Sequence, residues 1–595
     1  ERRNPKEEIT AAGMSGKDAG NREMRKRRKG KTARGERGDV NREREDAQGK
    51  KEDAYGRRKN LYGKREDSRR DGAVYPGPAG SGKMLRKDSA RNRIRRGEQY
   101  SCLGSGCLYA DGYLTVFLAL SIPVLLSLVL TLVEGARMNA IRMKTEIAGN
   151  VAARSVLGEF HRELLTQYDL YFVDASFGTG TASVENVQQH LRSYMEKNLS
   201  TEVSSVFGTN GDFTGTRLTE LTVNQTRFAA DDGARALREQ VYAYMSADPA
   251  GSILAPVLTD ADSWRGLLDD GAVWEKQRKE AEENLQKEIR EAKKKAKEDF
   301  TEEEREDAEE SGDNAAEEAI EEMNRFRLLP ILRQVFGDLS GVSTASSGGD
   351  LLSSRGIHYG DALQPENTHG YPGADEILFD LYLGEKCGCY TKPLEKGKLA
   401  YQLEYILSGK ETDRENLEKT AEKLLLVREA ANCAYLFTDT VRMKKAEALA
   451  ALVSLVLLCP ELKEAFKIAL LFAWAYLESI QDLRTLFDGG RVPLWKSPDT
   501  WQTPLLGIAA PEAAIRGGRK GSGLLYTDYL QAFLFLEGSS VKSLRTMEVM
   551  EMDIRKTPGN SQFRMDWCLD AFSMTAAVSS RFGYEYTLTK TEGYN

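Results

Sequence analysis

An uninterrupted run of apolar residues stands out near the start of the chain. Residues 113–133 read YLTVFLALSIPVLLSLVLTLV and carry no charge. About 20 such residues, wound as a helix, cross the hydrocarbon core of a bilayer, and buried core helices rarely run this long without a charge. The pattern therefore predicts a transmembrane helix over residues 113–134. A cleavable signal sequence is not indicated, because no small-residue cleavage motif follows the run.

Two residues in and beside this span are candidates for packing against other helices. Pro123 removes one backbone hydrogen-bond donor and should bend the helix, which neighbouring helices can accommodate in a membrane. Glu134 is the charged residue that directly follows the apolar run. We therefore name Pro123 and Glu134 as helix-packing candidates.

Beyond the span, apolar residues recur three or four positions apart from Met138 to Leu170, which is typical of a helix. The span and this stretch would form one helix of about 50 residues, or about 75 Å at 1.5 Å per residue. This stalk and a small α+β unit are expected to occupy residues 136–250. The predicted strands of the unit are residues 168–173 and 218–228, and its predicted helices are residues 184–199 and 231–246.

The middle of the chain is strongly charged. Residues 275–310 mix Glu and Lys around a thin apolar stripe, and a second helical stretch follows a Ser-Gly break and reaches Leu329. We interpret residues 275–329 as a solvated helical hairpin, with a partner-binding coiled coil as the alternative.

Residues 374–595 are predicted to be a helical domain that ends in antiparallel strands. The helices are expected at residues 411–436, 440–459, 461–487 and 523–536, and the strands within 562–589, joined at a turn of Arg581, Phe582 and Gly583. Residues 448–477 could form a second membrane hairpin, but each half is shorter than a span, so we prefer buried helices. The expected fold class is α+β: a single N-terminal transmembrane helix extended into a mostly helical ectodomain, with a small α+β unit and C-terminal antiparallel strands.

Charge is distributed unevenly on the two sides of the span. The first hundred residues hold 31 Lys and Arg against 17 Asp and Glu, whereas the rest of the chain holds 53 against 74. Because positively charged flanks stay in the cytoplasm, we expect a single-pass protein of the cell membrane. Its N-terminus would be cytoplasmic and its C-terminal domain extracellular.

The basic N-terminal segment has its own expected properties. Residues 1–100 contain few large apolar side chains and are expected to be disordered. Next to a membrane, their positive charge favours binding to anionic lipid over any specific nucleic acid. Met84 opens a short basic leader before the span, and we expect translation to start there.

Candidate chemistry is sparse. The seven cysteines do not resemble a disulfide framework, and the four histidines do not fall into a metal-binding spacing. A site made from His358, His369, Cys387 and Cys389 would need a Cys-Gly-Cys loop, which is tighter than the usual zinc loop. Nucleophile-elbow, dinucleotide and kinase signatures are missing from the sequence. We therefore expect no catalytic residues, cofactor, metal or enzymatic activity.

One helical segment, residues 473–484, draws attention through its acids. Glu478 and Asp482 lie four positions apart and carry like charges, so they offer each other no support on a helix. We expect them to face solvent or a basic partner. The apolar residues of the same segment should pack inward, as in an ordinary core helix.

The span also carries a family resemblance. Residues 116–126, VFLALSIPVLL, followed by VEGAR at 133–137, resemble the pseudopilins of tight-adherence (Tad/Flp) pilus systems. Phe117 stands where that family places a glutamate, so an accessory component is a better expectation than a filament subunit. The resemblance also implies a processing site between Gly112 and Tyr113.

The rest of the chain resembles an uncharacterised single-pass membrane family of Gram-positive anaerobes, a domain of unknown function. The stretches that carry this resemblance are residues 155–170, 399–419, 473–496 and 523–536. The family implies a place beside pilus or secretion proteins and no defined activity.

Together these features favour a membrane-anchored, non-enzymatic surface protein. Its expected role is that of an accessory or pseudopilin-like component of a Tad/Flp-type pilus or secretion assembly, with other membrane proteins of that assembly as partners. Two alternatives stay open: a sensor or cell-wall-binding ectodomain, and a cell-surface hydrolase that uses a carboxylate pair.

Overall fold

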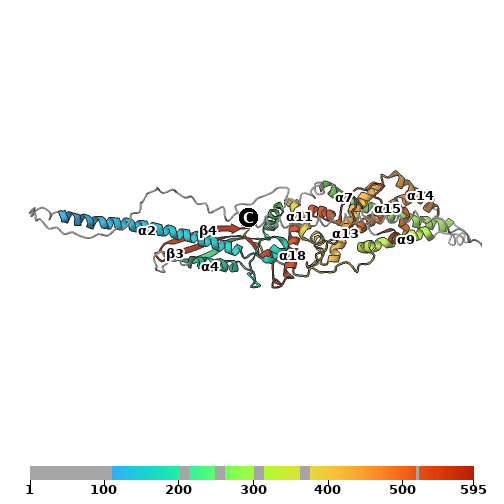
Figure 1. Cartoon of the computed structure of the whole chain (residues 1–595). Helices are drawn as coiled ribbons and strands as arrows, with labels where there is room; N and C mark the ends of the chain where they lie inside the picture. The colour runs from blue at the N-terminus through green and yellow to red at the C-terminus, as the bar shows by residue number, and fades with distance from the viewer. Residues whose placement is uncertain are drawn as a thin grey trace, which may run out of the picture. The chain divides into compact units, whose positions relative to one another are not determined.

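The computed structural model of the chain describes residues 110–200, 214–247, 261–299, 314–361, 363, 375–456, 459–516 and 521–594. Predictions about residues 1–100, Cys102, Cys107 and His369 fall outside this part of the chain. Within it, helices dominate, and an antiparallel sheet joins segments that are far apart in the sequence (Figure 1). The expected α+β class is confirmed.

The N-terminal apolar run lies in a helix of 48 residues, α2 (Ala110–Leu157), which continues through Pro123. The long helix is thus confirmed, but it ends well before Leu170. A second, short helix, α3 (Arg162–Tyr168), starts after the capping residue His161.

The strand predicted at residues 168–173 is wrong except at its end. The segment begins at the last residue of α3, and Asp169 adopts left-handed backbone angles with φ of 55°. Only the two residues of β1 (Val173–Asp174) pair with another strand. Leu170 and Phe172 are buried in alternate positions, which explains the strand-like pattern, but no strand in the described part of the chain pairs with them.

The sheet is built around β3 (Cys568–Ser580). The strand β2 (Thr216–Phe228) pairs with one edge of β3, and β4 (Glu585–Gly593) and β1 pair with the other, all antiparallel. The predicted strand at 218–228 and the C-terminal hairpin are both present. One face of this sheet shares a hydrophobic core with α2 and α4 (Val184–Ser200).

The remaining elements form a larger helical part with its own extensive core. Its helices are α5 (Asp231–Ser246), α7 (Ala261–Asp299), α9 (Asn314–Leu328), α10 (Ile331–Phe336), α11 (Asp375–Lys386), α12 (Gln402–Ser408), α13 (Asp413–Leu436), α14 (Thr440–Val456), α15 (Lys463–Phe487), α16 (Pro511–Ala514), α17 (Tyr526–Leu536) and α18 (Ser539–Arg555), with 3₁₀ turns η2 (Leu352–Ser354), η3 (Pro460–Leu462), η4 (Leu505–Ala509) and η5 (Met565–Trp567). Helices α5, α13, α14, α15 and α17 occupy the predicted positions, with ends shifted by at most three residues.

Helix α7 is not a solvated spacer along its N-terminal half. It begins earlier than predicted, and Trp264 and Leu267 are buried in the main core. Arg278 donates from Nε to Glu429 of α13 at 2.6 Å, and both side chains are buried. The charged composition of this helix therefore includes an internal ion pair as well as solvated faces.

The apolar residues 448–477 divide between two environments. The second half of α15 is buried from Leu471 onward. Leu452 and Leu455 of α14 are 61% and 66% exposed. Among the described helices, α2 is the one that is long and apolar enough to cross a membrane.

Candidate functional site

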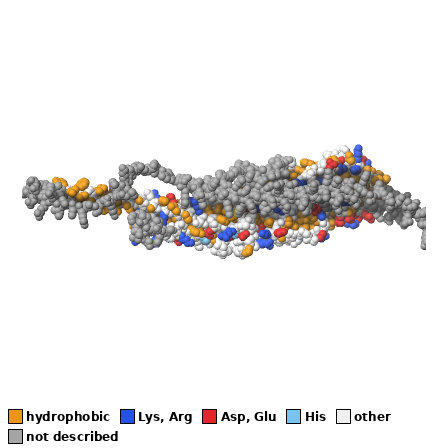
Figure 2. Space-filling view, in the orientation of Figure 1, with side chains coloured by type: hydrophobic (Ala, Val, Ile, Leu, Met, Phe, Trp, Pro, Cys, Tyr) orange, Lys and Arg blue, Asp and Glu red, His pale blue; other side chains and the backbone are white. Residues whose placement is uncertain are grey.

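The candidate span forms the exposed part of α2. From Tyr113 to Val133 its large apolar side chains are all exposed, and none packs into a core of the described chain. Figure 2 shows hydrophobic side chains gathered on this part of α2, at the left of the view. The hydroxyl groups of Ser127 and Thr131 donate to backbone oxygens of the same helix at 3.1 and 2.8 Å, so they do not need water. The segment therefore suits a hydrocarbon environment.

The residues singled out from the sequence occupy distinct places on α2. Gly112 and Tyr113 are the third and fourth residues of the helix. Pro123 lies in the exposed apolar segment, whereas Glu134 accepts a hydrogen bond from Arg137 Nη1 at 2.7 Å at the end of that segment. The structure does not bring the four residues together into one site.

The second half of α2 is fastened to the sheet by β4, which runs beside it. In order along α2, and along β4 and the turn before it, the contacts are Arg137 over the ring of Phe582, Arg142 Nε with Tyr584 Oη at 2.7 Å, Tyr586 Oη with Glu146 at 3.1 Å, and Arg154 with Glu592 at 3.3 Å. At the far end, Tyr594 Oη donates to the carbonyl oxygen of Leu157. This series fixes the direction in which the folded part leaves the end of the candidate span.

A glycine permits the closest approach in this series. A Cβ built on Gly149 would lie 2.4 Å from Leu588 Cδ2 and 3.6 Å from Met574 Cε. Gly149 thus lets β4 and α2 pack at short range. The alternation of Tyr584, Tyr586 and Leu588 is the sequence signal that could have revealed this junction.

One stripe of α2 beyond the apolar run is not covered by the sheet. Met143, Ile147 and Val151 are spaced four residues apart and are 63%, 50% and 40% exposed. Residues with this spacing share one face of a helix. After an interruption that includes the exposed Asn139 and Arg142, α2 therefore presents a second exposed apolar stretch along the folded part.

The two acids of residues 473–484 correct the sequence-based expectation. Glu478 and Asp482 are fully buried and do not face solvent. Lys496 Nζ lies between them, 2.6 Å from Glu478 Oε1 and 2.6 Å from Asp482 Oδ1. Arg428 adds a second cation, with Nη2 2.9 Å from Asp482 Oδ2. The basic partner is thus internal to the chain.

Two carboxylates and two cations make the cluster neutral. Because all four groups are buried, each charge is stabilised by its partners and not by water. Burial opposes ionisation of Asp482, but Lys496 and Arg428 outweigh it and lower the pKa of Asp482. Glu478 also accepts hydrogen bonds from the backbone N–H groups of Gln502 and Thr503, at 2.9 and 2.8 Å. The arrangement stabilises the core and offers no opening for a substrate.

Other perturbed carboxyl groups are equally enclosed. Burial raises the pKa of Glu404 to about 7, that of Asp380 to about 7 and that of Asp570 to about 6. Each is at most 1% exposed. Glu404 Oε1 accepts from Tyr526 Oη at 2.7 Å, and Asp380 pairs with Lys542. Such groups cannot act as acids or bases on an external molecule in this conformation.

The cysteines and histidines do not form a metal centre in the described part of the chain. Cys387, Cys389, Cys433, Cys459 and Cys568 are buried free thiols. The ring of His358 stacks on that of Trp567 with 3.5 Å between centroids. In the described ranges, no three His, Cys, Asp or Glu residues come together as a metal site.

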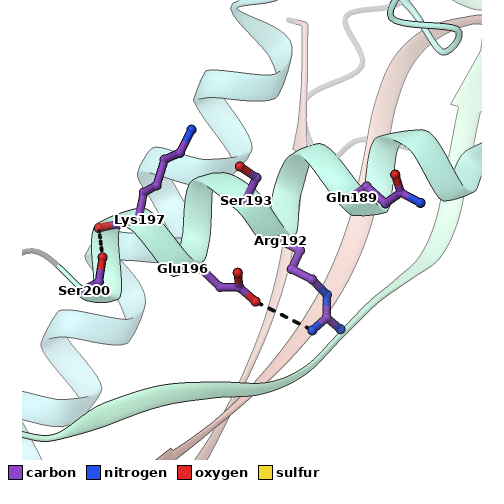
Figure 3. Close-up of a pocket in the computed structure, with 6 residues that line it drawn as sticks. All are labelled: Gln189, Arg192, Ser193, Glu196, Lys197 and Ser200. Atoms are coloured by element: carbon purple, nitrogen blue, oxygen red, sulfur yellow. Dashed lines mark hydrogen bonds and ion pairs between the residues drawn. The ribbon is translucent and has the colours of Figure 1, made fainter. Parts of the chain in front are cut away.

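A depression of about 390 Å³ lies along α4 (Figure 3). It is lined by Gln189, Arg192, Ser193, Glu196, Lys197 and Ser200. Arg192 pairs with Glu196 at 3.8 Å, and Ser200 Oγ donates to the carbonyl oxygen of Lys197 at 2.9 Å. Glu196, the carboxylate in this lining, pairs with Arg192, and the hydroxyl of Ser200 donates to a backbone oxygen. These described residues therefore do not show the paired serine and base of a nucleophilic site.

A model of a protein family matches part of the chain. Residues 309–580 match the model of a family described as a family of unknown function, DUF5702. This region holds the helical part from α9 onward and strand β3, but not α2, β2 or β4. No curated protein and no solved structure matches the chain. Nearly half of the chain is therefore similar to an uncharacterised domain family, whose description names no activity or partner.

Proposed function

We propose that the protein is a single-pass, membrane-anchored and non-enzymatic component of a surface assembly, of the Tad/Flp pilus or secretion type. In this proposal, residues 113–134 cross the cell membrane with the N-terminus in the cytoplasm and the folded part outside. The basic segment of residues 1–100 would lie against anionic lipid on the cytoplasmic side.

The observation that carries the proposal is the exposed apolar surface of α2, which lies in two stretches of the same helix. The segment up to Val133 suits lipid, and the stripe of Met143, Ile147 and Val151 lies on the same helix past the membrane. Exposed apolar side chains in a row indicate an interaction surface. A helix of a membrane partner could follow α2 through both regions.

Purification of the full chain from membranes tests this role. Membrane proteins of a pilus or secretion assembly should copurify with it. Ile147→Lys should reduce their recovery while the protein stays in the membrane fraction. The matched control is Val273→Lys, because Val273 of α7 is similarly exposed at 53%. Recovery of the chain as a lone monomer, or equal recovery of partners with Ile147→Lys, would contradict the proposal.

A further inference from the structure

The turn between β3 and β4 lies unusually close to the end of the candidate span. The guanidinium carbon of Arg137 sits 3.9 Å from the centre of the Phe582 ring. Phe582 is 53% exposed, and Arg581 beside it is also exposed. The turn therefore presents an aromatic ring and a cation at its tip, next to α2.

The turn has a defined conformation. The N–H of Ser580 donates to the carbonyl oxygen of Tyr584 at 2.8 Å, and the N–H of Gly583 donates to that of Ser580 at 3.1 Å. Gly583 has φ of 78°, a backbone conformation that favours glycine. The N–H of Arg581 donates to the carbonyl oxygen of Gly215 at 3.0 Å, which links the turn to the residue before β2. Phe582 is thus held in place rather than carried on a loose loop.

The helix rise sets the level of this turn relative to a membrane. Arg137 is four residues past Val133, so the two lie about 6 Å apart along the axis of α2. The headgroup layer on each side of the hydrocarbon core is about 5 to 8 Å thick. Arg137 and Phe582 would therefore lie at headgroup level if residues 113–133 fill the hydrocarbon core.

We propose that the Arg581–Gly583 turn contacts the phospholipid headgroup layer of the leaflet from which α2 emerges. Arginine side chains favour this layer, and phenylalanine is among the residues that enter the boundary between the headgroups and the acyl chains. Phe582 would lie at the boundary with the hydrocarbon, and Arg581 would meet lipid phosphates. Glu134 is the acid nearest to this level on α2, and Arg137 neutralises it at 2.7 Å. Glu585, the next acid on β4, is exposed.

This contact would give the protein a second support on the membrane besides α2. Tyr584 and Tyr594, the residues on either side of β4, bond to α2 at Arg142 and Leu157. A turn resting on the leaflet would therefore restrict the tilt of the whole sheet. The inference rests on the proposed membrane crossing, but it adds a lipid-contact site on a strand turn that is far from the span in sequence.

Photo-crosslinking of the full chain in phosphatidylglycerol vesicles tests the contact. The photoreactive residue p-benzoylphenylalanine replaces Phe582 in one variant and Tyr359 in a control variant. Tyr359 is 57% exposed. It lies close to Phe572 of β3, because Asp361, two residues further on, donates its N–H to Thr226, and Thr226 pairs with Phe572. Phe572 is nine residues from Arg581, about 30 Å along the strand and away from the span. A lipid adduct is expected at position 582 and none at position 359.

Alkaline extraction of the same vesicles separates the two hypotheses. If the chain is extracted, the membrane crossing itself fails. If the chain stays in the vesicles but position 582 yields no lipid adduct, or an adduct with protein only, the headgroup contact is overturned and the crossing stands. A second measurement uses the Phe582→Trp variant. Dibrominated phospholipid should quench its tryptophan fluorescence by more than it quenches that of the wild type if the lipid contact exists. Equal lipid labelling at position 359 would also overturn the contact.

Discussion

Replacement of Lys496 by methionine should destabilise the helical part strongly. Lys496 is fully buried, with its ammonium group 2.6 Å from both Glu478 and Asp482. Methionine fills a similar volume but carries no charge. The variant would leave Arg428 as the single cation opposite two buried carboxylates.

The expected magnitude follows from burial. Removal of one partner from a buried ion pair costs about 3 to 5 kcal/mol, because the remaining charge is left uncompensated. In urea this loss corresponds to a fall of about 1 to 2 M in the unfolding midpoint. The matched control is Lys463→Met, the same replacement at the start of α15, the helix that carries both acids. Lys463 pairs with Glu447 at 2.9 Å on the surface, so its loss should leave the midpoint unchanged.

Tryptophan fluorescence of the detergent-solubilised full chain reports on this region. The indole N–H groups of Trp474 and Trp501 both donate to the carbonyl oxygen of Thr503. The backbone N–H of Thr503 in turn donates to Glu478, so both rings lie close to the charge cluster. Adding Glu478→Gln to Lys496→Met restores a balanced cluster and should recover part of the lost stability. A midpoint for Lys496→Met equal to that of the wild type, or no recovery in the double variant, would refute the electrostatic reasoning.

Two further predictions use other features of the helical core. Gly271→Ala places a Cβ 2.5 Å from the carbonyl oxygen of Leu426, so it should push α7 from α13 and lower stability by about 1 to 3 kcal/mol. The control is Gly266→Ala in the same helix, where a Cβ meets nothing within 4 Å and should raise stability by up to about 1 kcal/mol. Equal urea midpoints for the two variants would contradict this account. Burial raises the pKa of Glu404 from 4.5 to about 7, so the folded chain holds a proton that the unfolded chain loses between these values. The free energy of unfolding should therefore fall as pH rises through this window. Glu404→Gln should make this fall smaller by about 3 kcal/mol. The same dependence of stability on pH in the variant and the wild type would argue against this assignment.

The strongest periodic patterns in the sequence led to correct elements. The uncharged run at residues 113–133 lies in α2, and the alternation around Arg581–Gly583 corresponds to the hairpin of β3 and β4. These elements follow from local patterns of hydrophobicity. The ends of such elements do not follow from these patterns, since the helical spacing runs to Leu170 whereas α2 stops at Leu157.

The errors arose where polar residues are buried. Helix α18 was not predicted, because Lys542, Glu548 and Glu551 interrupt its apolar pattern although all three are buried. Likewise, the like charges of Glu478 and Asp482 suggested a surface. Their partner, Lys496, comes from a loop that local sequence patterns do not place beside α15. Local sequence patterns therefore do not predict which charged residues pair across the core.

The junction between α2 and β4 was missed for the same reason. Its partners, such as Arg142 and Tyr584, are separated by more than 400 residues. The exposed apolar segment of α2 was predictable, whereas the sheet that fixes its direction requires the tertiary structure.

Protease treatment of intact cells, followed by alkaline extraction of their membranes and peptide mapping, tests the central claim most directly. If α2 anchors an external domain, peptides from residues 136–594 should be released by protease, and the anchored remainder should stay in the membrane pellet at alkaline pH. Protection of those peptides in intact cells, or extraction of the untreated chain into the alkaline supernatant, would contradict the account.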